Sequence, residues 1–339
     1  MPDNGPLAVY TDTDDLDPDS GCQLLRDNGF RAEVLQTRDP DVIAREAAGA
    51  TALLVGYAPI DRALLLRLPN LKIVALLSRG HDNVDVDAAA ELGIWVCTVG
   101  DVAAEEVATH AWTLTLALIR RLPFFAGFPT TCGWLDRPTS LPRRLSEMTV
   151  GVLGLGSTGR RYAALAAPTV REVLGFDIRT DRPEPAAGNR PAGTGLAGIG
   201  GARVTDLDSV LSRSDVISLH LPLTEGTREF LGENAFARMR QGVHLINVAR
   251  GTLIDSAALR HALDTGRVTA AALDVFDTEP PDPADPLIGH PNVLSTPHVA
   301  YLSDATTRGY IVAQAQNVVQ WMQTGTPVLA VNDPVVPVP

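Results

Sequence analysis

The feature that most constrains this chain is a glycine-rich turn between two apolar segments in residues 150–177. The turn reads G-x-G-x-x-G at Gly154, Gly156 and Gly159, and a helical pattern follows it. A second apolar strand then ends in Asp177, roughly 20 residues after the third glycine, as in the dinucleotide-binding fingerprint. The glycines alone would also fit a turn in another kind of α/β unit. With both strands and the acid, the pattern predicts a βαβ unit that binds a dinucleotide.

Each glycine has a physical role in such a unit. Gly154 permits the tight turn, Gly156 lets the backbone approach a pyrophosphate, and Gly159 lets helix and strand pack closely. The pyrophosphate would lie at the helix N-terminus, where free N–H groups and the helix dipole favour an anion. Ser157 and Thr158 begin that helix, so we expect their hydroxyls and backbone to contribute to the same contact.

Asp177 bears on the choice of cofactor. A carboxylate accepts hydrogen bonds from a free ribose 2′-hydroxyl and repels a 2′-phosphate, so it favours NAD over NADP. Arg179 and Arg182 follow it and would soften that repulsion, which leaves NADP as the alternative.

Strand and helix patterns alternate along most of the chain. One set of short apolar strands separated by helices covers residues 7–77, and an independent set begins at Thr149. This alternation is typical of parallel sheets with helices on both faces. We therefore predict an α/β fold of two doubly wound, Rossmann-like domains with a cleft between them. We also expect a joining helix, a surface loop and a C-terminal helix over residues 102–122, 182–201 and 303–324.

The composition limits the partners and the cellular setting. The 339 residues are 45% hydrophobic and carry a formal net charge of −12. They suffice for two domains with cores, and the charge argues against nucleic-acid binding. No apolar run has the length of a membrane span, and the chain begins without a signal pattern. Cys22, Cys97 and Cys132 have no metal-binding spacing, so we expect no metal and a reduced, cytoplasmic setting.

Three polar stretches follow later predicted strands, whose carboxyl ends are where open α/β sheets bind ligands. They supply a guanidinium, a carboxylate and an imidazole, from Arg250, Glu279 and His298. A guanidinium pairs bidentately with a carboxylate, and a histidine exchanges protons near neutral pH. A glutamate would orient the imidazole and favour its charged form. Hydride transfer between a nicotinamide and a carbonyl beside a carboxylate needs these functions.

Each of these residues also has a purely structural interpretation. Arg250 could cap a strand or form a surface ion pair, and Glu279 could be solvated in a proline-rich loop. His298 follows Pro297 and could be a turn residue. Together, after strands of one predicted sheet, the three favour a catalytic site.

Over nearly its whole length the chain resembles the D-isomer-specific 2-hydroxyacid dehydrogenases. The shared motifs are residues 80–85 (GHDNVD), the fingerprint, 220–224 (HLPLT), 247–251 (NVARG), 272–276 (ALDVF), Glu279-Pro280 and Thr296-Pro297-His298. The resemblance implies a substrate-binding domain of residues 1–120 and 300–339 and an NAD-binding domain of residues 121–299. It also implies a homodimer formed through the cofactor domains, and a C-terminal helix that packs on the first 120 residues.

By this resemblance, Arg250, Glu279 and His298 are the catalytic residues, with His298 as general acid/base. Asp274 would hold the nicotinamide carboxamide. Further cofactor contacts would come from Pro222, Val248 and Ala249. The substrate carboxylate would meet main-chain groups near Arg79 and Gly80, and the residues expected to shape the pocket are Tyr57, His81, Tyr301 and Leu302.

Three positions depart from the family pattern. Ser157-Thr158 replaces an arginine that meets the pyrophosphate in many relatives, so affinity would fall unless Arg160 or Arg161 compensates. Arg79 lies where small residues are common. It either points away or adds a second cation, which would suit a doubly anionic substrate. Thr109 stands where relatives often carry a glutamate.

The leading hypothesis is an NAD(H)-dependent oxidoreductase that acts on C2 of a D-2-hydroxy acid or 2-oxo acid, with a small molecule as its partner. One alternative is an NAD-sensing co-regulator like the C-terminal-binding co-repressors, which the chain resembles in residues 82–85 and near Tyr301. Another is oxidation of a phosphorus-containing acid, which only Arg79 suggests.

Overall fold

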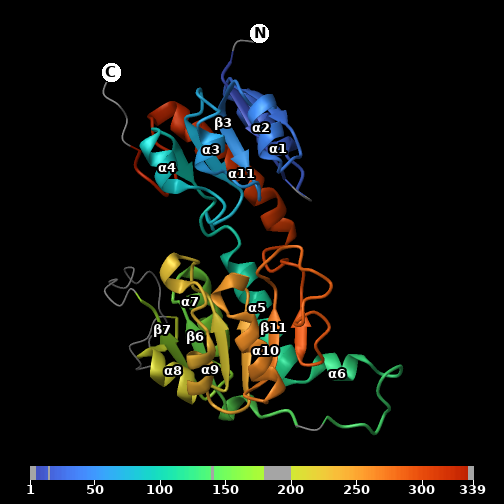
Figure 1. The fold of residues 1–339 in the computed structure, drawn as a ribbon. Helices are drawn as coiled ribbons and strands as arrows, with labels where there is room; N and C mark the ends of the chain where they lie inside the picture. The colour runs from blue at the N-terminus through green and yellow to red at the C-terminus, as the bar shows by residue number, and fades with distance from the viewer. Residues whose placement is uncertain (1–4, 14–15, 139–140, 179–199, 335–339) are drawn as a thin grey trace. The chain divides into compact units, whose positions relative to one another are not determined.

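The computed structural model describes residues 5–13, 16–138, 141–178 and 200–334 (Figure 1). The chain divides into two compact units: Met1–Val102 with Leu302–Pro339, here the first unit, and Ala103–Tyr301, the second unit. The chain thus changes unit near residues 102 and 301, whereas the sequence predicted changes near residues 120 and 300. Arg179, Arg182 and the expected loop up to residue 199 lie outside the described residues.

The first unit contains a five-stranded parallel sheet in the order β2-β1-β3-β4-β5. Its strands are β1 (Leu7–Tyr10), β2 (Arg31–Val34), β3 (Ala50–Val55), β4 (Ile73–Leu76) and β5 (Trp95–Cys97). Alternate strand residues enter two cores. Val9 and Leu53 pack with α2 (Pro40–Glu46), α3 (Arg62–Leu65) and α4 (Val86–Glu91). Tyr10 and Leu54 pack with α1 (Asp19–Asp27) and α11 (Asp304–Thr324).

Helix α11 joins the first unit through buried amide side chains as well as apolar contacts. The Gln314 side chain donates to the backbone carbonyls of Val55 and Ala75, at 3.2 and 2.9 Å. The Asn317 amide donates to the carbonyl of Thr98 at 3.0 Å. Since buried polar groups need such partners, these bonds fix the helix against β3 and β4.

The second unit contains a seven-stranded parallel sheet in the order β12-β11-β10-β9-β6-β7-β8. Its strands are β6 (Thr149–Leu153), β7 (Glu172–Phe176), β8 (Arg203–Val204), β9 (Val216–Leu219), β10 (Val243–Asn247), β11 (Val268–Leu273) and β12 (Val293–Ser295). Helices α8 (Leu207–Arg213), α9 (Glu233–Arg238) and α10 (Ser256–Asp264) cover one face, and α5 (Ala104–Ile119) and α7 (Ser157–Ala166) cover the other. The predicted fold class, two doubly wound parallel-sheet domains, is confirmed.

Helix α5 belongs to the second unit because of its apolar face. Ala108, Ala111 and Leu114 are buried in the same core as Val150 and Val152 of β6. The helix that the sequence suggested as a connection is therefore part of the second unit's core, and the chain changes unit just before it.

The described helices and the cysteines bear on the expected setting of the protein. None of the described helices is long and apolar enough to cross a membrane. Cys22, Cys97 and Cys132 are buried free thiols. Burial raises the pKa of the Cys97 thiol, which keeps it protonated and unreactive.

A buried ion cluster holds the edge of the second sheet opposite the strands' carboxyl ends. The Asp215 side chain, 1% exposed, accepts from Arg143 and Arg240 at 2.5 and 2.6 Å. It also accepts the backbone N–H of Thr149, at the start of β6, at 2.8 Å.

We predict that Asp215→Ala lowers the free energy of unfolding by about 3 kcal/mol, because it leaves two guanidinium groups and a buried N–H without their acceptor. Asp208→Ala is the control. Asp208 pairs with Arg238 but is 74% exposed, so we expect a loss below about 1 kcal/mol. Urea denaturation measures both, and equal losses would contradict the proposed role of Asp215.

Candidate active site

The glycine turn has the geometry that the fingerprint predicts. Gly154 follows β6 with a φ of +98°, and a Cβ there would lie 2.5 Å from the His220 carbonyl oxygen. A Cβ on Gly159 would lie 1.9 Å from the Gly154 carbonyl oxygen. Both positions therefore require glycine. Helix α7 begins at Ser157, so its first N–H groups lie at the turn, where they could hold a pyrophosphate.

Asp177 lies beside this turn, at the end of β7. Its carboxylate accepts the N–H of Leu155 at 2.7 Å, and the N–H of Gly154 donates to the Phe176 carbonyl at 2.8 Å. The acid is thereby fixed next to the position expected for the adenosine ribose. Arg160 is half-buried and Arg161 exposed in the first turns of α7.

Arg250, Asp274 and His298 follow three neighbouring strands, β10, β11 and β12. Because the three strands are parallel, their carboxyl ends lie at one edge of the sheet. The same edge carries the glycine turn and Asp177, after β6 and β7. The sheet thus places the expected cofactor-binding and catalytic groups along a single edge.

His298 and Glu279 form a close pair. His298 Nδ1 lies 2.6 Å from Glu279 Oε2, and the other carboxylate oxygen accepts the N–H of Phe276 at 2.9 Å. The two side chains are 28% and 32% exposed. Burial by itself would raise the pKa of Glu279, but the hydrogen bond and charge of His298, the Phe276 N–H and the charge of Arg250 together lower it. Glu279 is therefore a carboxylate that can orient the imidazole.

The loop of Arg250 is fixed by a buried asparagine. The Asn247 side chain donates to the Arg250 carbonyl at 2.8 Å and accepts the Ala249 N–H at 3.0 Å. A Cβ on Gly251 would lie 2.0 Å from the Phe276 carbonyl carbon, so glycine lets this loop approach the segment before Glu279. Arg250 is close enough for its charge to lower the Glu279 pKa.

The Asp274 carboxylate is fully buried and bonded to the loop that carries His298. It accepts the N–H groups of Val299 and Ala300 at 3.0 and 2.9 Å, and the Thr296 hydroxyl at 2.5 Å. Its contact with a nicotinamide carboxamide stays a prediction. The bonds present make Asp274 a positioning residue for the loop of His298.

A second histidine at this edge, His220, is unsuited to acid catalysis. It follows β9, and burial lowers its pKa to about 3. The Ser218 hydroxyl lies 2.9 Å from its Nε2. A neutral, buried imidazole cannot supply a proton at neutral pH, so His298 is the better candidate.

The first unit carries the other expected substrate residues at the carboxyl edge of its own sheet. Tyr57 follows β3 and is 41% exposed, and Arg79 and Gly80 follow β4. Arg79 forms an ion pair with Asp101, and both side chains are 54% exposed. The Arg79 charge is thus offset within the unit. His81, in the same loop, is exposed.

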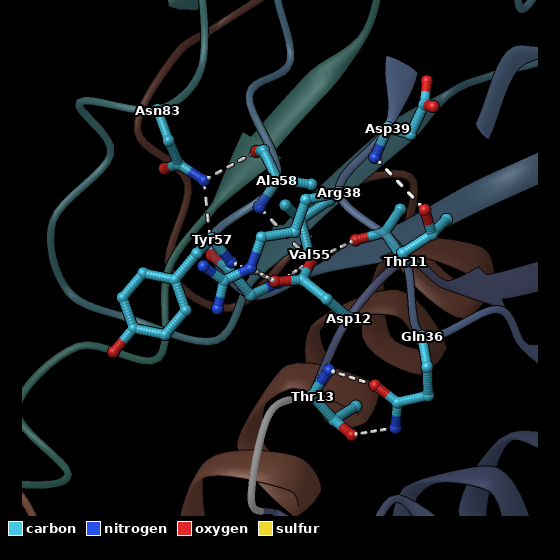
Figure 2. Close-up of polar contacts among 12 residues, drawn as sticks. Thr11, Asp12, Thr13, Gln36, Arg38, Asp39, Val55, Tyr57, Ala58 and Asn83 are labelled. Atoms are coloured by element: carbon cyan, nitrogen blue, oxygen red, sulfur yellow. Dashed lines mark hydrogen bonds and ion pairs between the residues drawn. The ribbon is translucent and has the colours of Figure 1, made fainter. Parts of the chain in front are cut away.

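Figure 2 shows that Asp12 holds the loop of Tyr57. Its buried carboxylate accepts the N–H groups of Gly56, Tyr57 and Ala58 at 3.2, 2.6 and 3.3 Å. From the other side, the Asn83 amide donates to the carbonyls of Gly56 and Ala58. Arg38 lies 3.3 Å from the Asp12 carboxylate and 4.9 Å above the Tyr57 ring centroid. The ring is thus presented by a fixed loop.

The remaining expected contacts belong to the second unit, except Leu302. Pro222 is exposed, Val248 is buried, Ala249 is half-buried, and Tyr301 is the last residue of the unit. Leu302 is exposed and begins the C-terminal part of the first unit.

Sequence reasoning missed Asp12, Asn247 and His110, whose side chains bind loops of the candidate site. Asp12 lies two residues after the short apolar strand β1 and Asn247 ends β10, which was an available signal. His110 lies on α5, and its Nε2 is 3.1 Å from the Thr296 hydroxyl, a contact across 186 positions of sequence. No local pattern reveals such a pair.

Comparisons with known proteins agree with this geometry. Residues 112–300 match the family description "D-isomer specific 2-hydroxyacid dehydrogenase, NAD binding domain". A glyoxylate reductase of Aeropyrum pernix is 35% identical over 301 residues, which cover 87% of this chain and 86% of that protein. A D-3-phosphoglycerate dehydrogenase of Archaeoglobus fulgidus is 33% identical over 93% of this chain, which spans only 58% of that protein's length.

The fold comparison points the same way. A structure of the D-lactate dehydrogenase from Aquifex aeolicus, complexed with NAD and lactic acid, superposes with a TM-score of 0.83 at 27% identity. The match covers 97% of this chain and all of that one. The chain is thus a two-domain Rossmann-type protein with a nicotinamide-dinucleotide-binding domain. It belongs to the D-isomer-specific 2-hydroxyacid dehydrogenase family.

We predict a pH-dependent stability difference between the wild type and Glu279→Gln. The folded-state pKa of Glu279 lies below its ordinary value of 4.5. Its contribution to stability is therefore present above that value and is lost as the pH falls through the folded-state pKa. The difference in unfolding free energy should be larger near pH 6 than near pH 3, roughly the two sides of this range.

Asp277→Asn is the matched control, since Asp277 lies in the same loop and accepts from the Ser256 hydroxyl rather than from a histidine. Urea denaturation across the pH range provides the measurement. A wild-type to Glu279→Gln difference that does not change with pH would show that the pair with His298 is absent in solution.

Proposed function

We propose that this protein is an NAD(H)-dependent oxidoreductase that transfers a hydride between nicotinamide C4 and C2 of a D-2-hydroxy acid or 2-oxo acid. The observation that carries the proposal is the His298–Glu279 pair beside Arg250, at a sheet edge that also carries the glycine turn. When bound, the nicotinamide would donate or accept the hydride. The other functions fall to side chains of this chain.

His298 is the proposed proton donor and acceptor. Its Nδ1 faces Glu279, so Nε2 is the atom that would give a proton to the carbonyl oxygen during reduction and take it back during oxidation. Glu279 stays ionised at neutral pH and stabilises the imidazolium that precedes proton donation. Arg250 would hold the substrate carboxylate and polarise the neighbouring carbonyl.

The proposed cofactor is NAD rather than NADP. The glycine turn and the start of α7 fit a pyrophosphate, because side chains at Gly154 and Gly159 would collide with backbone. Asp177 is fixed beside the turn and would accept a bond from a ribose 2′-hydroxyl but repel a 2′-phosphate.

The proposed substrate carries a single carboxylate. Main-chain groups near Arg79 and Gly80 would bind it, and Tyr57 would limit the size of its side chain. Since Arg79 is paired with Asp101, its charge does not favour a doubly anionic acid. We therefore place oxidation of a phosphorus-containing acid behind the 2-hydroxy-acid reaction.

A homodimer formed through the second unit is proposed from an apolar segment. Residues 122–138, which include α6 (Leu122–Ala126), extend from the end of α5 (Figure 1). Trp134, Leu135 and Leu141 are 78%, 80% and 71% exposed. Apolar side chains gathered in this way usually mark an interface, and a second copy of the chain is the partner that closed symmetry favours. The buried free thiols fit the proposed cytoplasmic setting.

The catalytic proposal predicts that the purified protein oxidises NADH with at least one of glyoxylate, hydroxypyruvate, pyruvate and phenylpyruvate. It should oxidise NADH faster than it oxidises NADPH. His298→Ala should lose at least about a thousandfold in turnover while still binding NADH, because proton transfer is lost. His261→Ala, at an exposed histidine of α10, is the control and should keep full activity.

Absence of turnover on a broad panel of 2-oxo acids with both cofactors, despite NADH binding, would refute the enzyme and favour the NAD-sensing alternative. Full activity of His298→Ala would refute the role of that residue alone.

The dimer proposal predicts that sedimentation velocity shows a dimer for the wild type and a monomer for the double variant Trp134→Ser/Leu135→Ser. Leu66→Ser, at a residue of the first unit that is 60% exposed, should remain dimeric. A wild-type monomer at high protein concentration would contradict the proposed interface.

A further inference from the structure

We propose that His110, on α5, is a positioning residue that holds the Asp274 carboxylate and, through it, the loop of the catalytic histidine. The proposal rests on the function proposed above for His298. It concerns residues of the second unit only, and His110 lies outside the sequence motifs by which the chain was seen to resemble the family.

The hydrogen-bond chain from His110 runs in one direction. Thr296 Oγ1 lies 2.5 Å from Asp274 Oδ1 and 3.1 Å from His110 Nε2. An ionised carboxylate only accepts, so the single hydroxyl hydrogen of Thr296 points to Asp274. The Thr296 oxygen then accepts from His110, and Nε2 must carry a hydrogen. The network therefore selects the Nε2–H form of His110, or its protonated form.

His110 also lies close to the acid itself. Its Nε2 is 3.6 Å from Asp274 Oδ1, and the Asp274 side chain has no exposed surface. A buried carboxylate is unstable unless donors compensate for its lost water. Thr296, Val299 and Ala300 supply three donors directly. His110 supplies a fourth polar N–H behind Thr296, which polarises that hydroxyl towards the acid.

The same acid residue fixes a strained backbone. His298 has a φ of +52°, in the left-handed region that non-glycine residues seldom occupy. Its N–H donates to the Asp274 carbonyl at 2.8 Å. The next two N–H groups donate to the Asp274 carboxylate. Such a conformation persists only where its surroundings hold it. Loosening Asp274 should therefore move His298 away from Glu279.

His110 lies close to the point where the chain enters the second unit. Helix α5 begins one residue after Ala103, where the chain enters the second unit, and Tyr301 is where it leaves. His110 lies two turns into α5, and Asp274 binds the N–H groups just before Tyr301. The His110–Thr296–Asp274 hydrogen bonds thus connect the first turns of α5 and the residues just before Tyr301 to the loop of His298.

The experiment compares His110→Ala, His110→Gln and Thr296→Val with the wild type. We expect His110→Ala to lower kcat about tenfold, the effect of losing one partly buried hydrogen bond. The KM for the 2-oxo acid should change little, because the substrate carboxylate is held by Arg250 and not by His110. His110→Gln can still donate to Thr296, so it should restore most of the rate. Thr109→Ala, at the exposed neighbouring position, should match the wild type.

Two readouts do not depend on turnover. NADH fluorescence titration should show weaker binding in His110→Ala, because Asp274 lies at the expected nicotinamide end of the edge. Hydrogen exchange of the peptide that contains Val299 and Ala300 should be faster in His110→Ala and unchanged in Thr109→Ala.

A double-mutant cycle tests whether His110 acts on Asp274 through the Thr296 hydroxyl. If His110 acts through Thr296, the variant His110→Ala/Thr296→Val should lose no more in kcat than the worse single variant. Losses that multiply, or a fully active His110→Ala with wild-type hydrogen exchange, would overturn the proposal. A wild type that turns over no 2-oxo acid would instead refute the proposed function, while the hydrogen-exchange comparison would still decide whether His110 holds the loop. If His110→Ala does not fold, His110→Gln and the Thr296 variant carry the same comparison.

Discussion

The parallel alignment of β6, β7, β9, β10, β11 and β12 in one sheet is the constraint on which the site depends. A parallel sheet brings every carboxyl end to one edge, so residues far apart in sequence meet without a dedicated scaffold. The glycine turn follows β6, Arg250 follows β10 and His298 follows β12. An antiparallel partner among these strands would place its polar group at the opposite edge, and the cation, acid and imidazole would not meet.

Buried polar side chains then fix the loops that leave this edge. Asp12 binds three consecutive N–H groups of the Tyr57 loop, Asn247 bridges the Arg250 loop, and Asp274 holds the loop of His298. Each anchor lies at or just past the end of a strand and has little or no exposed surface. In the interior such bonds are stronger than in water, and leaving one unmade is expensive. The exposed functional side chains are therefore carried by backbone that is not free to move.

Much of this arrangement could be predicted from sequence, because its signals are local. Apolar strands, the glycine spacing and the acid that ends β7 identified two doubly wound domains and the nucleotide turn. Arg250, Glu279 and His298 could be placed together because each follows a strand of one sheet. What could not be predicted depends on contacts between distant segments. The apolar face of α5 could fit either sheet, so the change of unit near residue 102 could not be read from the sequence. The Arg79–Asp101 pair and the His110–Thr296 contact likewise leave no trace in a local pattern.

We propose that a nicotinamide bound at this edge transfers a hydride to C2 of a 2-oxo acid while His298 supplies the proton. The most direct test follows the label from NADH deuterated at both C4 positions into the product of the best 2-oxo acid other than glyoxylate, by mass spectrometry and chiral chromatography. We expect one deuterium at C2 of the D-2-hydroxy acid and an unlabelled hydroxyl after exchange with water. A product without deuterium at C2, or one of L configuration, would contradict it.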